Sequence, residues 1–280
     1  MESLRKSEQY GRVKGVKLVE ALVDGGRFLF TTADAQAEGQ RLGLSPGTIL
    51  VTLTELARAG WILRLRRGLY ATTGSLPGGI ELPAFAIATA LVTPSAVSHW
   101  SALGHHHLTD QIPRTVTAMT TRRVVLPTMR RGGRTGARHA WAVGTTSVEY
   151  VTVNPRRFFG IEDVWLDDRF KTSITDRERT VLELFVSPRH FGGLGEALGV
   201  LEEHLASLDI PKLVRYGVAV GVASVAKRLG FSLERAGVDP ATLEPLRAVP
   251  AAGVLVLDPT RPKVGQRVTP WSLVDNLTPV

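Results

Sequence analysis

Apolar residues near the N-terminus recur twice at helical spacing, and a strand-like alternation follows them. The second stripe predicts a helix whose buried side is formed by Ile49, Leu53 and Leu56, with Leu50 and Ala57 beside them. The opposite face of that helix would carry Thr48, Thr52, Glu55 and Arg58. The earlier stripe predicts a supporting helix with an inner side of Val16, Leu18, Val19 and Leu22. Asp24-Gly25-Gly26 would end this helix, and its outer side carries Lys14 and Lys17.

The two helices on either side of Gly43 have recognisable beginnings. Thr31 would cap the first, which is predicted over Ala33 to Leu42. Asp34 would be the acidic residue of the capping box and would accept a hydrogen bond from the backbone of Thr31. Gly43 supplies a residue that can take the left-handed conformation at the helix C-terminus. Ser45-Pro46 then provides the cap and the first residue of the next helix. Together these signals predict a helix-turn-helix.

A period-two alternation from Trp61 to Arg66 predicts a strand with its apolar members inward and its arginines outward. Arg67-Gly68 predicts a turn, and Leu69-Tyr70-Ala71 the returning strand. The segment from Phe30 to Tyr70 is therefore predicted to be a helix-turn-helix followed by a β-hairpin wing. Three arginines, at positions 64, 66 and 67, would lie on or beside the tip of this ribbon.

This segment favours DNA as a partner. A helix N-terminus with small side chains can enter the major groove while arginines of a ribbon reach phosphates or the minor groove. The predicted recognition face offers Ser45, Thr48 and Thr52 but no Arg, Asn or Gln for a bidentate base contact. Sequence reading would then depend on methyl contacts and DNA shape. A protein-interaction module and an ordinary solvated basic hairpin are the alternatives.

Composition and charge agree with that interpretation. The chain has 280 residues, 44% apolar and 21% charged, which is typical of a globular protein with room for two domains. The net charge is +8: residues 1–75 hold 11 Lys and Arg against 7 Asp and Glu, residues 76–148 hold 7 against 2, and residues 149–280 hold 16 against 17. The whole excess lies in the first half, as expected if one part of the protein meets a polyanion.

The chain contains no cysteine, which excludes disulfides and thiolate metal sites and fits a reducing cytoplasm. The N-terminal residues lack the apolar core of a signal peptide, and no apolar run approaches the length of a membrane span. We therefore expect a soluble, cytoplasmic protein with no membrane partner.

The turn-rich segment from Thr72 to Gly79 predicts a boundary between an N-terminal domain, residues 1–76, and a C-terminal domain, residues 80–280. Helices are predicted after the boundary over Pro83 to Val92, Pro94 to Leu103, Arg177 to Val186 with Asp176 as its cap, Leu194 to Leu208, and Ile210 to Leu229. Strands are predicted over Pro113 to Thr121, Ser147 to Val153, around Val164 to Leu166, and over Gly253 to Leu257. The predicted fold class is α+β, a winged helix-turn-helix followed by a larger mixed α/β domain.

The segment from Leu126 to His139 is rich in glycine and strongly positive. Its arginines are Arg130, Arg131, Arg134 and Arg138, and no acid occurs between Asp110 and Glu149. Composition alone leaves two interpretations open: a second contact with nucleic acid or an acidic partner, and a solvated hairpin tip.

Three groups of residues have the types found in metal, catalytic or phosphate-binding sites. His105-His106-His107, with His99 upstream, suggests a metal, but adjacent histidines point in different directions and no carboxylate pair accompanies them at ligand spacing. Residues of triad type occur at Ser98, His99, Ser101 and Asp110, without a Gly-x-Ser-x-Gly elbow. Gly192-Gly193-Leu194-Gly195 lacks the ending of a phosphate-binding turn and is interpreted as a loop between helices. We therefore predict no catalytic residues, no metal and no cofactor.

The motifs in their order resemble the AbiEi family of antitoxins from type IV toxin–antitoxin systems. The resemblance rests on Arg67-Gly68-Leu69-Tyr70, Ser98-His99-Trp100-Ser101-Ala102-Leu103, Leu108-Thr109-Asp110-Gln111-Ile112-Pro113, Asp176-Arg177-Glu178-Arg179-Thr180, Gly192-Gly193, Arg228-Leu229-Gly230-Phe231 and Trp271. The glycine- and arginine-rich loop has no counterpart among these motifs.

The resemblance implies a repressor whose winged domain binds inverted repeats in its own promoter, as two monomers or as a dimer. It also implies that the C-terminal domain helps to neutralise a nucleotidyltransferase toxin encoded beside it. Carried over by position, the DNA-facing group would be Ser45, Thr48, Thr52, Arg64, Arg66 and Arg67. Lys14 and Lys17, on the outer side of the supporting helix, are predicted to bind DNA with them.

An alternative from another class remains open. The chain would then be a stand-alone winged-helix regulator whose C-terminal domain binds a small ligand or carries an unrecognised activity. A deep pocket with convergent polar groups near His99, Asp110 or Asp176 would favour that alternative.

Overall fold

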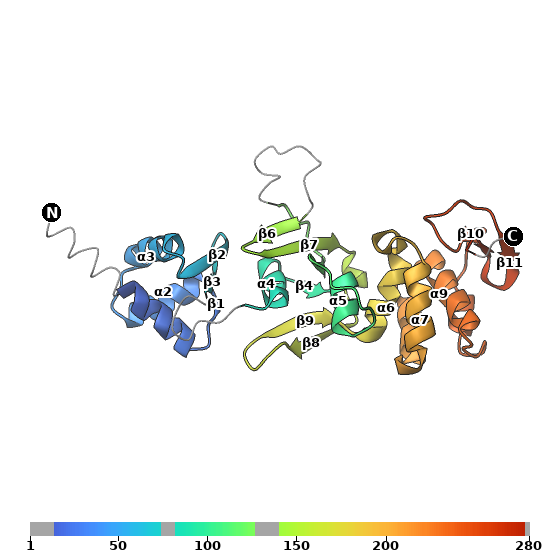
Figure 1. Cartoon of the computed structure of the whole chain (residues 1–280), viewed down its shortest axis with the longest axis horizontal. Helices are drawn as coiled ribbons and strands as arrows, with labels where there is room; N and C mark the ends of the chain where they lie inside the picture. The colour runs from blue at the N-terminus through green and yellow to red at the C-terminus, as the bar shows by residue number, and fades with distance from the viewer. Residues whose placement is uncertain (1–13, 74–81, 127–139, 278–280) are drawn as a thin grey trace. The chain divides into compact units, whose positions relative to one another are not determined.

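The computed structural model describes residues 14–73, 82–126 and 140–277 (Figure 1). The chain divides into two compact units. The first comprises Met1–Thr93, Ala142–Thr146 and Trp165–Lys171, and the second comprises Pro94–Trp141, Ser147–Val164 and Thr172–Val280. The predicted domain limits of 1–76 and 80–280 stay a prediction, because residues 74–81 lie outside the described part of the chain.

The first unit contains the predicted helices and hairpin strands of the N-terminal segment in the predicted order. Residues 14–24 are helical, and the elements that follow are β1 (Leu29–Thr31), α2 (Thr32–Arg41), α3 (Pro46–Arg58), β2 (Ile62–Arg66), β3 (Leu69–Thr72) and α4 (Ala84–Leu91). The unit thus also contains strand β1, which is not predicted, and α4, which the sequence assigns to the C-terminal domain. The three strands form an antiparallel sheet in the order β1-β3-β2. The helices pack on one another around a core that includes Leu18, Leu22, Phe30, Ile49, Leu53 and Ile62.

The close packing of α2 on α3 depends on a glycine. A Cβ atom at Gly39 would lie 2.6 Å from Cδ1 of Ile49, so a larger residue would push the two helices apart. Gly43 follows with a φ of 74°, which glycine adopts without strain, and Leu44 returns into the core with 5% of its surface exposed. The predicted turn is therefore present.

A mixed sheet of six strands has the order β6-β7-β5-β4-β9-β8. The strands are β4 (Ser95–Val97), β5 (Val116–Thr120), β6 (Ala140–Val143), β7 (Thr146–Thr152), β8 (Ile161–Trp165) and β9 (Lys171–Thr175). β5 pairs parallel with β7 and antiparallel with β4, and β4 pairs parallel with β9.

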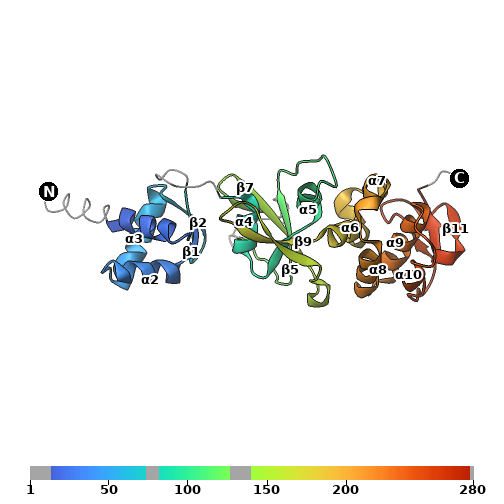
Figure 2. The same cartoon turned by 90° about the horizontal axis from the view of Figure 1, so that it is seen from below.

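The C-terminal half of the second unit is mainly helical. Its helices are α6 (Arg177–Val186), α7 (Gly195–His204), α8 (Ile210–Ala219), α9 (Ala223–Arg235) and the short α10 (Glu244–Arg247), and α5 (His99–His105) precedes them in the chain. Figure 2 shows the group α6 to α10 together with strand β11. This strand belongs to a small sheet of order β10-β12-β11, whose strands are Leu255–Val256, Leu273–Asp275 and Gln266–Val268. The shared core of these helices and this sheet surrounds Trp271 and Leu229, both fully buried.

These observations confirm the α+β fold class, and they correct two predicted elements. The predicted helix from Pro94 to Leu103 is wrong, because Ser95–Val97 forms strand β4 and the helix begins only at His99. Backbone pairing of β4 with β5 and β9 outweighs the helical pattern there. The single helix over Ile210 to Leu229 is also wrong, since Gly221, at a φ of 68°, separates α8 from α9.

Within the described residues, no helix is both long enough and apolar enough to cross a membrane.

A methyl group added to α9 at Gly230 is expected to be destabilising. The Cβ of Gly230→Ala would collide with the Trp271 ring, which is fully buried and cannot move aside. Overpacking of this kind lowers the free energy of unfolding by about 1–3 kcal/mol, measurable by urea titration. Gly199→Ala in α7, where nothing lies within 4 Å of the new Cβ, is the control and should not destabilise. Equal stability of the two variants would contradict the close contact.

Candidate nucleic-acid interface

The predicted helix caps are present in the first unit. The backbone N–H of Thr31 donates to Oδ2 of Asp34 at 2.7 Å, and the N–H of Asp34 donates back to Oγ1 of Thr31 at 3.2 Å. Hydrogen bonds from the Thr31 hydroxyl and backbone hold the pKa of Asp34 below its usual value. Oγ of Ser45 accepts the N–H of Thr48 at 3.2 Å, and Pro46 follows as the first residue of α3. The beginning of α3 is thus fixed by local contacts.

Replacement of the Ser45 cap is expected to weaken the first unit. Ser45→Ala leaves the N–H of Thr48 without its side-chain acceptor, and loss of such a cap costs about 1 kcal/mol. Urea unfolding should show that loss. Thr54→Ala, an exposed position in the middle of the same helix, is the control and should change the free energy of unfolding by less than about 0.5 kcal/mol. A Ser45→Ala variant as stable as the wild type would show that the cap contributes nothing.

Helix α3 turns one side to solvent and the other to the core. Its exposed residues are Pro46, Gly47, Thr48, Leu50, Val51, Thr54, Glu55 and Arg58. Within this set Thr48, Val51, Glu55 and Arg58 are spaced three or four residues apart and lie on one face. Val51 is at the centre of that face and 58% exposed. The predicted site residues do not include Val51 or Arg58. The sequence places Arg58 on this face, and the spacing of Val51 from Thr48 is a signal that indicates the same face.

Two predicted side-chain positions on α3 are wrong. Thr52 was expected on the DNA-facing side, but it is buried, with 5% of its surface exposed. It lies three residues after Ile49 and four before Leu56, so the helical period places it on the inner stripe. Leu50 was expected beside the buried stripe, and it is 48% exposed. Thr52 is therefore removed from the candidate interface.

The β2–β3 hairpin presents the predicted arginines. Ile62 pairs with Thr72 and Arg64 with Tyr70, but the register shifts before the pair Arg66–Leu69. This β-bulge lets both Ile62 and Leu65 be buried, at 1% and 4% exposure, although strict alternation would place them on opposite faces. The two-residue turn at Arg67-Gly68 has Gly68 at a φ of 77°.

Three cations at the hairpin are free to meet an external anion. Arg64, Arg66 and Arg67 are all exposed, and none forms an ion pair with an acid among the described residues. The only side-chain bond found for them there is a long one, 3.4 Å, from Nη1 of Arg66 to the carbonyl oxygen of Arg67. On the helix of residues 14–24, Lys17 is exposed and Lys14 is half-buried. The arrangement can attract a polyanion but holds no group for covalent chemistry.

The second basic group cannot be placed. Arg130, Arg131, Arg134 and Arg138 all lie in residues 127–139, outside the described part of the chain.

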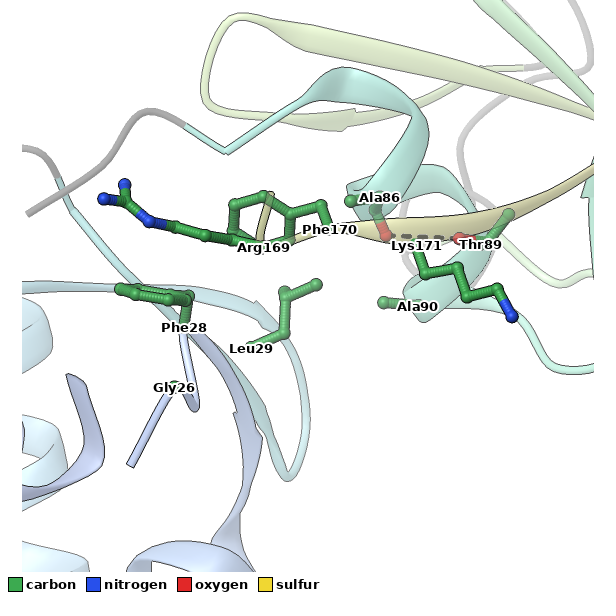
Figure 3. Close-up of a pocket in the computed structure, with 9 residues that line it drawn as sticks. All are labelled: Gly26, Phe28, Leu29, Ala86, Thr89, Ala90, Arg169, Phe170 and Lys171. Atoms are coloured by element: carbon green, nitrogen blue, oxygen red, sulfur yellow. Dashed lines mark hydrogen bonds between the residues drawn. The ribbon is translucent and has the colours of Figure 1, made fainter. Parts of the chain in front are cut away.

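The first unit also has a cavity, drawn in Figure 3. Its volume is about 290 Å³, and its lining is Gly26, Phe28, Leu29, Ala86, Thr89, Ala90, Arg169, Phe170 and Lys171. The rings of Phe28 and Phe170 are 5.7 Å apart, and the guanidinium of Arg169 lies 5.8 Å from the Phe28 ring. The hydroxyl of Thr89 donates to its own helix backbone, and the charged side chains of the lining are two cations, Arg169 and Lys171. His99, Asp110 and Asp176 are not part of it.

Two of the triad-type residues, Ser98 and His99, form a buried network with Glu183 in the second unit. Oγ of Ser98 lies 2.8 Å from Nδ1 of His99, and Nε2 of His99 lies 3.4 Å from Oε2 of Glu183. Ser98, His99 and Glu183 are each at most 1% exposed, so no substrate reaches the hydroxyl. Burial lowers the pKa of His99, against the smaller opposing effect of Glu183. His99 has a φ of 53°, and the surrounding packing holds this strained backbone.

Asp176 is likewise engaged in structure. It caps α6 by accepting the N–H of Arg179 at 2.8 Å, and it accepts the Tyr216 hydroxyl at 2.8 Å. Lys212 lies 3.1 Å from Asp176 and 2.8 Å from Glu178. Burial lowers the pKa of Lys212, but the hydrogen bonds to the two carboxylates outweigh it and raise the pKa overall. This carboxylate is therefore part of an ion-paired cluster that joins α6 to α8.

The histidines of the run at positions 105–107 differ in their surroundings. Nε2 of His106 contacts the carbonyl oxygen of Thr175 at 2.7 Å, while His107 is exposed. Among the residues that the structure describes, no group of three or more histidines and carboxylates is arranged to hold a metal ion.

The structure therefore has two helices joined by a tight turn, followed by a basic hairpin, in the first unit, and a larger second unit of helices and strands. Residues 17–73 match the family described as "Transcriptional regulator, AbiEi antitoxin". The resemblance predicted from the motifs is thereby confirmed for this part of the chain.

The fold as a whole is similar to a known structure, that of the RV2827C protein from Mycobacterium tuberculosis. The two chains share 18% sequence identity with a TM-score of 0.60, over 93% of this chain and 92% of the other. At this identity the likeness concerns the fold alone. No curated protein sequence matches the chain.

Proposed function

We propose that the protein is a DNA-binding transcriptional repressor that regulates its own operon and acts as the antitoxin of a nucleotidyltransferase toxin. In this proposal the first unit is a winged helix-turn-helix, with α3 in the major groove and the β2–β3 hairpin on the flanking backbone. The observation that carries the DNA half is the set of three exposed arginines, 64, 66 and 67, that no acid of the described residues neutralises. The match of residues 17–73 to an antitoxin regulator family supports it independently.

The other residues of the proposed DNA-facing group differ in their exposure and position. Ser45, Thr48 and Lys17 are exposed, and Lys14 is half-buried. Ser45 and Thr48 stand at the N-terminus of α3, where a helix enters the groove first and where its dipole favours a phosphate. Arg58, at the other end of the same exposed face, is added to the group.

The proposal is tested by gel-shift of the full chain on the DNA upstream of its own gene, with a salt series and a scrambled competitor. We expect specific retention that weakens linearly on a log–log plot as salt rises. If the scrambled duplex competes as well as the upstream DNA does, the first unit binds DNA without sequence preference. That result would overturn autoregulation.

The antitoxin half rests on the family description and needs its own experiment. The product of the adjacent gene would be expressed with and without the full chain, and bacterial growth recorded. Growth arrest relieved by the chain is the expected result. A neighbour that never arrests growth, or arrest that the chain does not relieve, would leave only the regulator.

The proposal does not use the second unit as an enzyme or a small-ligand module. His99 is enclosed and Asp176 is held by Tyr216 and Lys212, while Asp110 is exposed. These placements give the alternative no support.

A further inference from the structure

The hydroxyl groups on α3 are already engaged within the helix. Oγ of Ser45 lies 2.8 Å from Oγ1 of Thr48 and also accepts the N–H of Thr48, so the pair retains a single free hydroxyl proton. Oγ1 of Thr54 donates to the carbonyl oxygen of Leu50 at 2.9 Å. What these threonines can offer to a groove is therefore mainly their methyl groups.

Val51 lies at the centre of the same face. It is 58% exposed, and its neighbour Leu50 is 48% exposed, although the core beneath α3 is complete without them. Between Pro46 and Thr54 the helix has no arginine, asparagine or glutamine, the residues that make bidentate contacts with guanine or adenine. The part of α3 that would enter a groove first thus presents an apolar, methyl-rich surface.

Charge decides what kind of partner this surface fits. Arg64, Arg66 and Arg67 on the hairpin are exposed and lack acidic partners in the described residues, and Arg58 ends the exposed face of α3. An apolar strip accompanied by unneutralised cations fits a polyanion that itself carries methyl groups. In the major groove of DNA the only such group on an unmodified base is the C5-methyl of thymine.

We propose that α3 reads its DNA site through thymine C5-methyl groups, with Val51 as the principal contact and the methyls of Thr48 and Thr54 beside it. The inference rests on the proposed DNA binding and adds the chemical feature that is recognised. It makes Val51 a specificity-determining residue. Glu55, one turn further on, is placed to accept a hydrogen bond from cytosine N4.

The test compares two duplexes of the upstream DNA, one natural and one with every thymine replaced by uracil. Uracil pairs like thymine and lacks only the methyl group. For the full-length protein we expect weaker specific binding to the uracil duplex, about fourfold for each thymine methyl that the protein buries on natural DNA. Replacing thymines one at a time should concentrate the loss of affinity at a few positions.

A Val51→Ala variant links the loss of affinity to this side chain. It should bind natural DNA several-fold more weakly than the wild type and should lose less on going from thymine to uracil, because the partner of the methyl is already gone. Val218→Ala, an exposed valine of α8 in the second unit, is the matched control and should behave as the wild type. Val51 is exposed, so the variant is expected to fold, and its circular dichroism and thermal midpoint should match the wild type.

The outcomes separate this inference from the function on which it depends. Specific binding that is equal on natural and uracil DNA overturns methyl reading and leaves the repressor proposal intact. Strictly additive effects of Val51→Ala and uracil overturn the assignment to Val51. Absence of specific binding to either duplex overturns the repressor proposal, and methyl reading with it.

Discussion

Reversal of the three hairpin charges, Arg64→Glu, Arg66→Glu and Arg67→Glu together, is expected to abolish retention of the upstream DNA at moderate salt. Each arginine that neutralises a phosphate releases counterions, so its removal lowers the log–log salt slope by about 0.9. The glutamates add repulsion from the backbone phosphates. Because the three arginines are exposed and unpaired in the described structure, the variant should keep its fold.

The control for this variant must change the net charge equally. Arg114, Arg189 and Arg215 are exposed residues of the second unit, and their reversal alters the charge by the same amount. If the hairpin is the contact, the control variant keeps most of its specific binding at moderate salt. Equal losses in the two variants would show that net charge alone determines retention. Unchanged binding of the hairpin variant would contradict the assignment of these arginines to DNA.

The hairpin and the helix caps could be predicted because their signals are local. The Thr31–Asp34 capping box, the Ser45 cap and the left-handed Gly43 each depend on residues within four positions. The structure places all three as the sequence predicts. The exposure of Arg64, Arg66 and Arg67 was predictable for the same reason, since a short turn leaves its neighbours at the tip.

The misplaced side chains show where local reasoning stops. Spacing alone does not decide whether the residues at the two borders of an apolar helix face are buried. Their burial depends on which neighbouring elements cover each border. Thr52 is covered by the helix of residues 14–24, since a Cβ on Gly15 would lie 3.2 Å from its methyl carbon. Leu50, at the other border, has no such cover and stays 48% exposed. The interface therefore contains one threonine fewer and more apolar surface than the pattern predicted.

The elements of the second unit that escaped prediction depend on distant pairing. β4 is three residues long and becomes a strand only because β5 and β9 lie on either side of it. His99 and Glu183 are 84 residues apart in sequence (183 − 99) and meet in the core. A periodic pattern along the chain does not indicate contacts between residues so far apart in sequence. The motif from Asp176 to Thr180 can therefore be recognised in the sequence, but the distant residues that it contacts cannot.

Removal of the Arg179 side chain is expected to be the most destabilising single change considered. Arg179 is 1% exposed and lies with its Nη2 2.6 Å from Oε1 of Glu183, which is equally buried. Its guanidinium also donates to the carbonyl oxygens of Phe159 and Arg157, each at 3.1 Å. Arg179→Ala leaves the carboxylate of Glu183 without its cation and two carbonyls without their donors. Breaking a buried pair from one side costs about 3–5 kcal/mol in the free energy of unfolding.

Urea unfolding of the full chain, followed by tryptophan fluorescence, measures this decrease in stability; Trp100 and Trp271 report on the second unit. Arg215→Ala, an exposed arginine of α8, is the control and should stay within about 0.5 kcal/mol of the wild type. The double variant Arg179→Met with Glu183→Leu removes both charges and should recover part of the stability, because the penalty comes from the uncompensated charge. A decrease below about 1 kcal/mol in Arg179→Ala would show that the pair contributes little.

The double variant also identifies the cause of the destabilisation. Recovery of stability in Arg179→Met with Glu183→Leu would assign the decrease to the stranded carboxylate of Glu183. No recovery would assign it to the missing packing of Arg179 against Phe159.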